Sequence, residues 1–357
     1  METPNTASLT ARAKRWISRT AGLYTPSNLV DKGVAWAAGL VVATLLVFYS
    51  ALGIYWSREP KQFSINYAVN ELRTDKNAPI VTGQRTTAAL IMAARTLLDK
   101  PGGYLSNDVT PPGVFLDNMP NWEFGALVQI RDLAKSLRND MSRSQSQSVE
   151  QPDLAEADPL FNSPNDRWLF PASERQYQKG IEYMTNYFNK LSKPDSSTNF
   201  YARADNLSDW LAIVEKRLGS LSQRLSASVG QVRVNTDLAG DSAATESTRS
   251  PSVMVIKTPW TQLDDVFFEA RGSAWALIEF LKAAELDFSE VLKKKNALVS
   301  MRQIIRVLES TQDPLWSPII LNGSGFGFVT NHSLVMASYI SSANAAVIDL
   351  RNLLQQG

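Results

Sequence analysis

Cysteine is absent from this 357-residue chain, and histidine occurs once, as His332. Without cysteine the chain cannot form disulfides, thiolate nucleophiles, or cysteine-ligated zinc and iron–sulfur centres. A single histidine also excludes metal motifs that need two. We therefore expect neither a metal nor another cofactor, and we expect His332 to have a capping or other structural role.

A strong excess of charge of either sign is also missing, because 36 basic side chains face 35 acidic ones. Nucleic-acid-binding domains carry a basic surface, so we expect no nucleic-acid partner. The sequence contains no P-loop, nucleophile elbow, kinase signature set or dinucleotide fingerprint. These absences favour a protein that is not an enzyme, although they leave carboxylate chemistry open.

The chain does contain one long uncharged run, from residue 33 to residue 57. A helix of this length spans the hydrocarbon core of a bilayer, which is about 30 Å thick. Trp36 near one end, and Tyr55 and Trp56 at the other, suit the level of the lipid headgroups. The apolar region of a cleaved signal peptide is shorter, about 7–15 residues. We therefore predict a transmembrane helix over 33–57 that holds the chain in a lipid bilayer.

Basic residues lie on both sides of this run, and their distribution bears on its orientation. Five precede it and four follow closely, namely Arg12, Lys14, Arg15, Arg19 and Lys32 against Arg58, Lys61, Arg73 and Lys76. That count gives only a weak bias under the positive-inside rule. Residues 9–23 also have an apolar face with interleaved basic residues, which suits an anionic cytoplasmic leaflet. We predict that residues 1–32 form a cytoplasmic basic tail and that the C-terminal domain lies across the membrane.

The rest of the chain repeats apolar residues at helical spacing, with almost no strand-like alternation. We therefore predict an all-α fold, in which a single N-terminal transmembrane helix is followed by a multi-helix bundle. The two cleanest stripes run from Leu207 to Leu225 and from Met336 to Leu354. Each stripe either belongs to the core of one chain or joins two copies in a homo-oligomer; the core is the commoner use.

Composition divides the bundle into two helical regions, over 58–230 and 258–357, which we expect to pack on each other. Residues 231–257 between them are rich in Gly, Asp, Ser and Thr, which is typical of a flexible linker. Val232 and Val234 alternate with polar residues, as Val253 and Val255 do. This pattern is compatible with one small β-hairpin within the linker.

An unusual loop over 100–122 is too long for an ordinary helix–helix connection, and it carries apolar residues that argue for order. It is either a recognition surface or a structural cap on the bundle. Tyr104, Phe115 and Trp122 are the candidate binding residues of such a surface.

Acidic residues in and beside the same loop are the candidate catalytic groups. Glu123 follows the loop directly, and Asp108 and Asp117 lie within it. Glycoside hydrolysis needs an acid with a raised pKa and a second carboxylate about 5–9.5 Å away. If the loop brings them together, Glu123 is the candidate acid, and Asp108 or Asp117 is the second carboxylate.

The uncharged run, the helical remainder and the segment KPGGYLSNDVTPPGVFLDNMPNWEFG (residues 100–125) together resemble a family of uncharacterised bacterial inner-membrane proteins. The resemblance implies a bacterial inner-membrane address, with the C-terminal domain in the periplasm, and it implies no activity. Our leading hypothesis is a single-pass protein whose periplasmic domain is an interaction or scaffold module for other envelope proteins. The alternatives are an envelope enzyme that cleaves cell-wall glycan and a helical domain that binds a small ligand or lipid beside the 100–122 loop.

Overall fold

The computed structural model describes residues 32–356, apart from 146–147, 194–196, 235–252, 318 and 325–326, together with scattered positions between 11 and 28. Most of the predicted basic tail, including much of the amphipathic segment 9–23, lies outside these residues. The chain divides into two compact units, Met1–Tyr55 and Trp56–Gly357.

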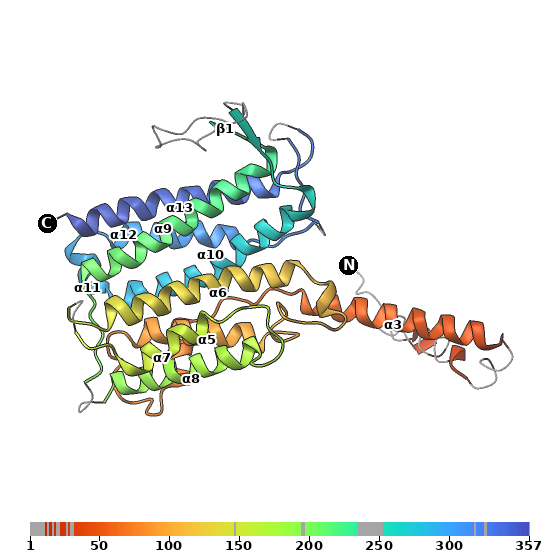
Figure 1. The fold of residues 1–357 in the computed structure, drawn as a ribbon, viewed down its shortest axis with the longest axis horizontal. Coiled ribbons are helices and arrows are strands. Elements are labelled where there is room, and N and C mark those ends of the chain that lie inside the picture. Colours follow the sequence, from red (N-terminus) through yellow and green to blue (C-terminus); the bar gives the residue numbers. More distant parts are fainter. Residues whose placement is uncertain are drawn as a thin grey trace, which may run out of the picture. The chain divides into compact units, whose positions relative to one another are not determined.

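The first unit contains nearly all of α3 (Val34–Trp56), a helix of 23 residues without a charged side chain (Figure 1). Apolar side chains are exposed on all its sides; Val34, Val47 and Ile54, for example, are each at least 70% exposed. The helix is long and apolar enough to cross a membrane, and its bounds agree with the predicted 33–57. Exposed apolar area costs about 25 cal/mol per Å² in water, so an apolar environment would stabilise this surface.

The second unit is a helical bundle, which confirms the predicted fold class. Its helices are α4 (Ile65–Leu72), α5 (Gln84–Asp99), α6 (Asn118–Ser136), α7 (Pro152–Phe161), α8 (Ser173–Leu191), α9 (Ala204–Ser226), α10 (Leu263–Asp287), α11 (Ser289–Lys294), α12 (Leu298–Glu309) and α13 (His332–Gln355). The predicted hairpin is also present, because β1 (Gln231–Val234) pairs antiparallel with β2 (Val253–Ile256). The rest of the predicted linker, 235–252, lies outside the described residues.

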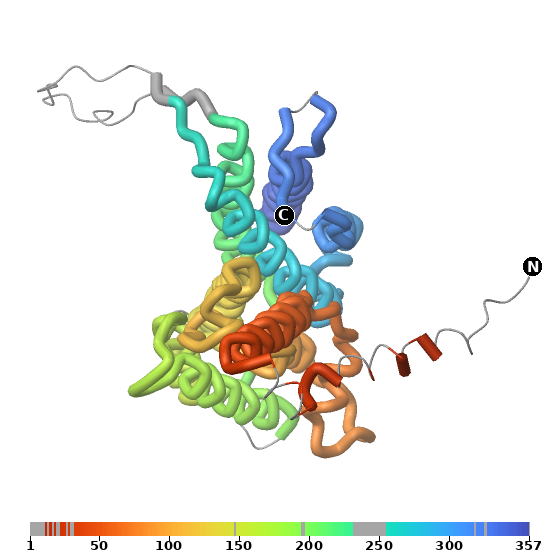
Figure 2. The backbone as a smooth tube through the Cα atoms, turned by 90° about the vertical axis from the view of Figure 1, so that its right-hand side faces the viewer, coloured from red at the N-terminus to blue at the C-terminus, as the bar shows by residue number. Residues whose placement is uncertain are grey.

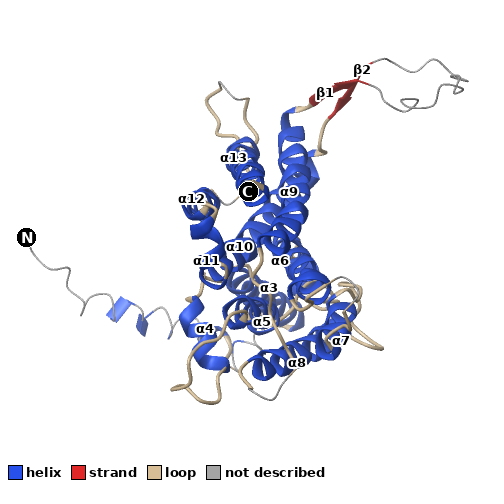
Figure 3. Cartoon of the chain, turned by 90° about the vertical axis from the view of Figure 1, so that its left-hand side faces the viewer, coloured by secondary structure: helices blue, strands red, loops and turns tan. Residues whose placement is uncertain are grey.

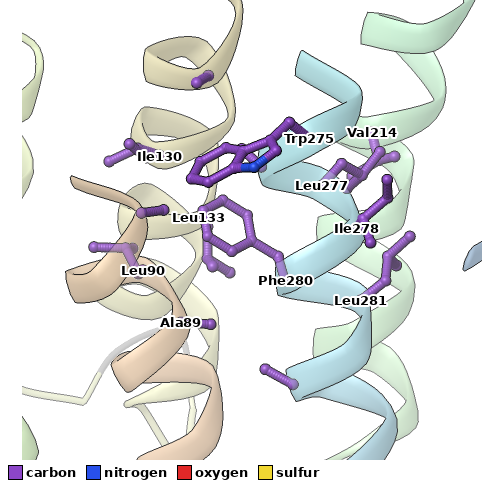
Figure 4. Close-up of a cluster of buried hydrophobic side chains, with 14 of the residues drawn as sticks. Ala89, Leu90, Ile130, Leu133, Val214, Trp275, Leu277, Ile278, Phe280 and Leu281 are labelled. Carbon is purple, nitrogen blue, oxygen red and sulfur yellow. The ribbon is translucent and has the colours of Figure 1, made fainter. Parts of the chain in front are cut away.

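Helix α10 is central to the bundle and packs most extensively against α6. In Figure 3 these two helices lie between a layer of α9, α12 and α13 and a layer of α5, α7 and α8. Apolar side chains from α5, α6, α9 and α10 fill the space between the layers, with Trp275 and Phe280 among the largest (Figure 4). The two helical regions expected from the sequence therefore form a single unit.

The α6–α10 pair is parallel and unusually close. Asn121 donates to Asp265 and Gln129 donates to Ser273, both at 2.7 Å, so the two helices advance together. A Cβ atom on Gly125 would run into the backbone oxygen of Glu269, and the reciprocal glycine of α10, Gly272, faces the backbone of Trp122. Glycine is required at both positions because the helix backbones touch there.

The two predicted stripes lie inside the chain. Helix α9 packs along α13, and the stripe residues Leu207 to Leu225 and Met336 to Leu354 are buried. Contacts of Ser208 with Gln355 and of Glu215 with Arg351 show that the pair is antiparallel. Both stripes therefore contribute to the core of one chain, since each covers the other.

Helix directions give the bundle two distinct ends, to the right and left of the bundle in Figure 1. One end gathers the first turns of α6, α8, α10 and α13 and the last turns of α5 and α9. The contacts that place them there are Lys100–Glu123, Tyr104–Tyr177, Phe267–His332 and Ser228–Asn322. We call this the near end, and Figure 2 looks onto it. At the opposite, far end, α10 finishes against the start of α5 through Asp287 and Thr86.

Candidate functional site

Glu123 organises the 100–122 loop from the first turns of α6. Its carboxylate is fully buried and lies 2.5 Å from the Nζ of Lys100. It also accepts hydrogen bonds from the Leu105 amide at 2.9 Å and from the amide and hydroxyl of Ser106 at 2.8 and 2.6 Å. Burial raises the pKa of Glu123, while Lys100 and these donors act in the opposite direction. One carboxylate thus fixes the first part of the loop, from Lys100 to Ser106.

The three candidate acids have different surroundings. Glu123 is enclosed by the loop, so a glycan cannot reach it. Asp117 caps α6 by accepting a hydrogen bond from the Asn118 amide at 2.9 Å. Asp108 packs against Gly113, and partial burial together with the nearby Glu174 raises its pKa. The candidate acid Glu123 therefore has a structural role and is not accessible to a glycan.

The three candidate aromatic residues also differ in their surroundings, because two are buried and one is exposed. Trp122 is fully buried, with its ring centroid 5.0 Å from that of Trp275, and Tyr104 is buried edge-on against Tyr177. The prediction that these two residues line a loop surface is therefore wrong. Phe115 is 77% exposed and does lie on the surface. The inward side of the loop is filled by packed side chains, as in a structural cap.

Residues 57–63, which follow α3 directly, are fastened along α10; we call them the connecting segment. The Arg271 guanidinium donates two hydrogen bonds to Glu59, at 2.8 and 2.6 Å. Further along, the Phe63 amide donates to Glu279 at 3.2 Å, and Lys282 donates to Gln62 at 3.1 Å. The segment therefore enters at the near end and runs toward the far end.

Arg271 connects this segment to a second loop. It is buried and donates to the backbone oxygens of Thr311 and Asp313, at 2.9 and 3.0 Å, as well as to Glu59. A cavity of about 350 Å³ lies on one side of it, lined by Phe267, Trp316, His332, Met336 and Tyr339 among others. A second cavity, of about 620 Å³, is lined by Ser57, Lys61, Trp275 and Leu315 among others. Both cavities border the 313–317 loop.

Glu279 is the buried acid beneath the connecting segment. Its Oε1 accepts from the Phe63 amide, and its Oε2 has no hydrogen-bond partner among the residues that the structure describes. Burial raises the pKa of Glu279 to about 7; the Lys282 ammonium and the Phe63 amide oppose this shift. The charge of the helix beneath the connecting segment therefore changes near neutral pH.

His332 has a structural position at the start of α13. Its Nδ1 accepts a hydrogen bond from the Leu321 amide at 3.0 Å, and its ring lies near Phe267. Asn331 is the residue that caps the helix, by accepting from the Leu334 amide. In the part of the chain that the structure describes, no group of three or more acidic or histidine side chains could hold a metal ion.

Sequence reasoning did not identify Arg271, Glu279 or Lys100. A signal for the first two was present, because each is a charged residue set among the apolar residues of a core helix. Their partners lie more than 200 positions away, at Glu59 and Phe63. The pairing of Lys100 with Glu123 required knowledge of how the loop between them folds.

These features define a class of protein, an all-α bundle that follows an apolar helix and begins with a short segment hydrogen-bonded along α10. The model of a bacterial family matches residues 29–357, and the family is described as "Uncharacterized protein conserved in bacteria (DUF2333)". Because the match covers nearly the whole chain, the protein belongs to this family. No curated protein and no solved structure matches the chain.

Proposed function

We propose that this protein is a single-pass protein of the bacterial inner membrane whose helical bundle is an interaction or scaffold module in the periplasm. The observation that carries the proposal is the exposed, uncharged surface of α3, which has apolar side chains on every side. A helix that is apolar all round requires either a protein core or lipid around it. Membership of a bacterial family supports the bacterial setting.

The connecting segment, which directly follows the proposed anchor, is itself part of the bundle. A flexible tether would let the bundle move freely at the membrane. Here Glu59, Gln62 and Phe63 each have a hydrogen-bond partner on α10, and the Phe63 ring lies 6.0 Å from that of Trp275. A scaffold benefits from so short a connection, because it keeps the bundle close to the bilayer.

Neither alternative function is favoured by the contacts. Cleavage of a glycan would require Glu123 to be reachable, and its carboxylate is enclosed by Lys100, Leu105 and Ser106. A ligand site with its mouth at the 100–122 loop would require a hollow behind that loop, where Tyr104 and Trp122 are packed in the core. We therefore retain the interaction module as the conclusion.

The side of the membrane is tested by fusing either alkaline phosphatase or green fluorescent protein to the C-terminus of the full chain. Alkaline phosphatase folds actively only outside the cytoplasm, whereas exported green fluorescent protein stays dark. We expect an active phosphatase fusion and a dark fluorescent one, because long domains cross the membrane largely regardless of charge. The opposite pair of results would place the bundle in the cytoplasm.

The interaction role is tested by crosslinking in intact cells, followed by affinity capture of the full chain. The matched control is Ile340→Asp, which places a charge in the core beside α9 and leaves α3 intact. We expect envelope proteins that are captured by the wild type and lost with the control. Capture of the same proteins by both chains, or of none reproducibly, would contradict a scaffold function of the folded bundle.

A further inference from the structure

Exposed tryptophan and phenylalanine residues are distributed unevenly over the bundle. Outside α3, the exposed tryptophan and phenylalanine side chains of the described residues are Phe115, Trp168, Phe170, Trp260, Trp316 and Phe328. Even the least exposed of them, Trp168, is 55% exposed. A tryptophan or phenylalanine buries about 150–250 Å² when it finds a partner, so leaving six in water is unfavourable. Large exposed apolar areas of this kind mark interaction sites.

All six residues belong to loops or turns at the near end. Phe115 precedes α6, Trp260 precedes α10, and Trp316 and Phe328 lie between α12 and α13. Trp168 and Phe170 precede α8, in a loop that is joined to the 100–122 loop by the hydrogen bond from Asn107 to the Arg167 oxygen, at 2.7 Å. These connections face the viewer in Figure 2. The far end has exposed aliphatic residues, such as Leu286 and Val299, but none of these aromatic ones among its described residues.

The chain reaches α3 from this same end. Ser57, the first residue after α3, lines a cavity together with Leu315 and Ser317, the two neighbours of Trp316. From Ser57 onward the connecting segment runs away from the near end, along α10. If α3 spans a bilayer, Ser57 lies at the headgroup level, with the 313–317 loop beside it and the other loops at the same end of the bundle. Tryptophan in particular concentrates at that level of a membrane.

The spacing of the loops favours a lipid surface over a protein partner. The six aromatic side chains come from four separate connections around one end of the bundle, instead of lining one groove. A protein partner would need a complementary shape for each separate loop. A bilayer needs none, because its headgroup region deforms around each inserted side chain.

We infer that the near end of the bundle rests on the membrane and inserts its exposed aromatic side chains into the headgroup region as a second, peripheral attachment beside α3. The inference depends on the proposed function, in which α3 spans the bilayer. It adds that the bundle has a fixed face toward the lipid and presents its far end to the periplasm.

The absence of cysteine makes a direct test straightforward, because each single-cysteine variant carries one label. The full chain is reconstituted into vesicles of phosphatidylethanolamine and phosphatidylglycerol and labelled with a fluorophore. The near-end variants are Phe170→Cys, Trp316→Cys and Phe328→Cys. The matched far-side variants replace exposed apolar residues of the bundle, Leu286→Cys, Val299→Cys and Ile348→Cys. Leu46→Cys reports on α3.

Lipids brominated near the headgroup quench only fluorophores that enter the bilayer surface. We expect the three near-end labels to lose fluorescence in brominated vesicles and the three far-side labels to keep it. All replaced residues are exposed, so these substitutions leave the core intact. Circular dichroism of each variant checks that it is folded.

The Leu46 label, measured with lipids brominated near the bilayer centre, separates this inference from the proposed function. Quenching at Leu46 without quenching at the near end would overturn the peripheral attachment and leave the anchor in place. Absence of quenching at Leu46 would overturn the anchor itself. Iodide in the buffer quenches labels that are exposed to water. If it quenches the near-end labels in vesicles but not in native membranes, a protein partner covers them, which would also overturn the lipid contact.

Discussion

The two ends of the bundle are fastened in similar ways but have different surfaces. At the near end Glu123 is buried against Lys100, and at the far end Asp287 is buried against the amide and hydroxyl of Thr86, at 2.8 and 2.9 Å. Each end therefore uses a buried carboxylate to fix a loop or a helix start. Only the near end displays exposed tryptophan and phenylalanine among the described residues of the bundle. Stability does not account for that difference, so we attribute it to function.

The largest expected effect is at the near end. Replacing Lys100 by methionine leaves the Glu123 carboxylate buried without its ion-pair partner, which should lower the free energy of unfolding by about 3–5 kcal/mol. Urea denaturation of the full chain in micelles measures this loss. Lys293→Met is the control, because that lysine pairs with Glu290 in solvent. A loss below about 1 kcal/mol, as expected for a surface pair, would contradict the role of Glu123 in fixing the loop.

Between the two ends, Glu279 should make the stability depend on pH. Its pKa rises from 4.5 to about 7 on folding, so the folded state binds the proton more tightly. The resulting stabilisation is fully present below about pH 4.5 and is lost as the pH rises through about 7. The total is of the order of 3 kcal/mol, because one pKa unit corresponds to about 1.4 kcal/mol.

Urea denaturation between pH 4.5 and 8 tests this dependence by comparing the wild type with Glu279→Gln. The difference between the two curves should fall as the pH rises. Glu290→Gln, a change of an exposed acid, serves as the control and should run parallel to the wild type. A parallel curve for Glu279→Gln as well would show that this buried acid does not titrate as described.

At the far end the expected effect is smaller. Thr86→Val keeps the shape of the side chain and removes one hydrogen bond to the buried Asp287 carboxylate. Hydrogen bonds to charged groups contribute about 1.5–3 kcal/mol, so the free energy of unfolding should fall by that amount. Thr96→Val on the same helix removes only a bond to the backbone oxygen of Met92. Equal losses in the two variants would mean that Asp287 does not fasten the far end.

The close contact between α6 and α10, behind the near-end loops, should contribute a similar or smaller amount to the free energy of unfolding. Gly125→Ala introduces a Cβ into the backbone of α10, and such overpacking costs about 1–3 kcal/mol. Gly219→Ala on α9 meets only the side chain of Asn344, at 3.6 Å, and should stabilise the helix by up to about 1 kcal/mol. Thermal unfolding should therefore move in opposite directions for the two alanines. A rise in both would show that α6 and α10 are not in backbone contact.

The fold could be predicted from two different kinds of apolar pattern, which α3 and α13 illustrate. Both are long and apolar enough to cross a membrane by composition. In α13 the apolar residues repeat at helical spacing and are buried against α9, whereas in α3 they occupy every side. The helical spacing thus favoured a core helix in α13, and the long uncharged run predicted a membrane-spanning helix in α3. The parallel α6–α10 pairing was not predictable, because the sequence does not show that Gly125 and Gly272 lie against each other's helix backbone.

The candidate site was predicted less well than the fold. The 100–122 loop is ordered, as its apolar residues indicated, but the sequence could not separate inward from outward side chains. Tyr104 and Trp122 are inward and Phe115 is outward, because irregular backbone has no fixed period. Arg271 and Glu279 were missed because their partners lie in the connecting segment, far away in the sequence.

Extraction of bacterial membranes with alkaline carbonate tests whether α3 spans the bilayer, since it strips peripheral proteins and leaves membrane-spanning ones in the pellet. We predict that the full chain stays in the pellet with its N-terminal residues intact by mass spectrometry. A variant with two charges in α3, Leu45→Asp with Leu46→Asp, should pass to the supernatant because each charge disfavours insertion. Release of the wild-type chain by carbonate, or a mature chain that begins after Trp56, would show that α3 is not a membrane anchor.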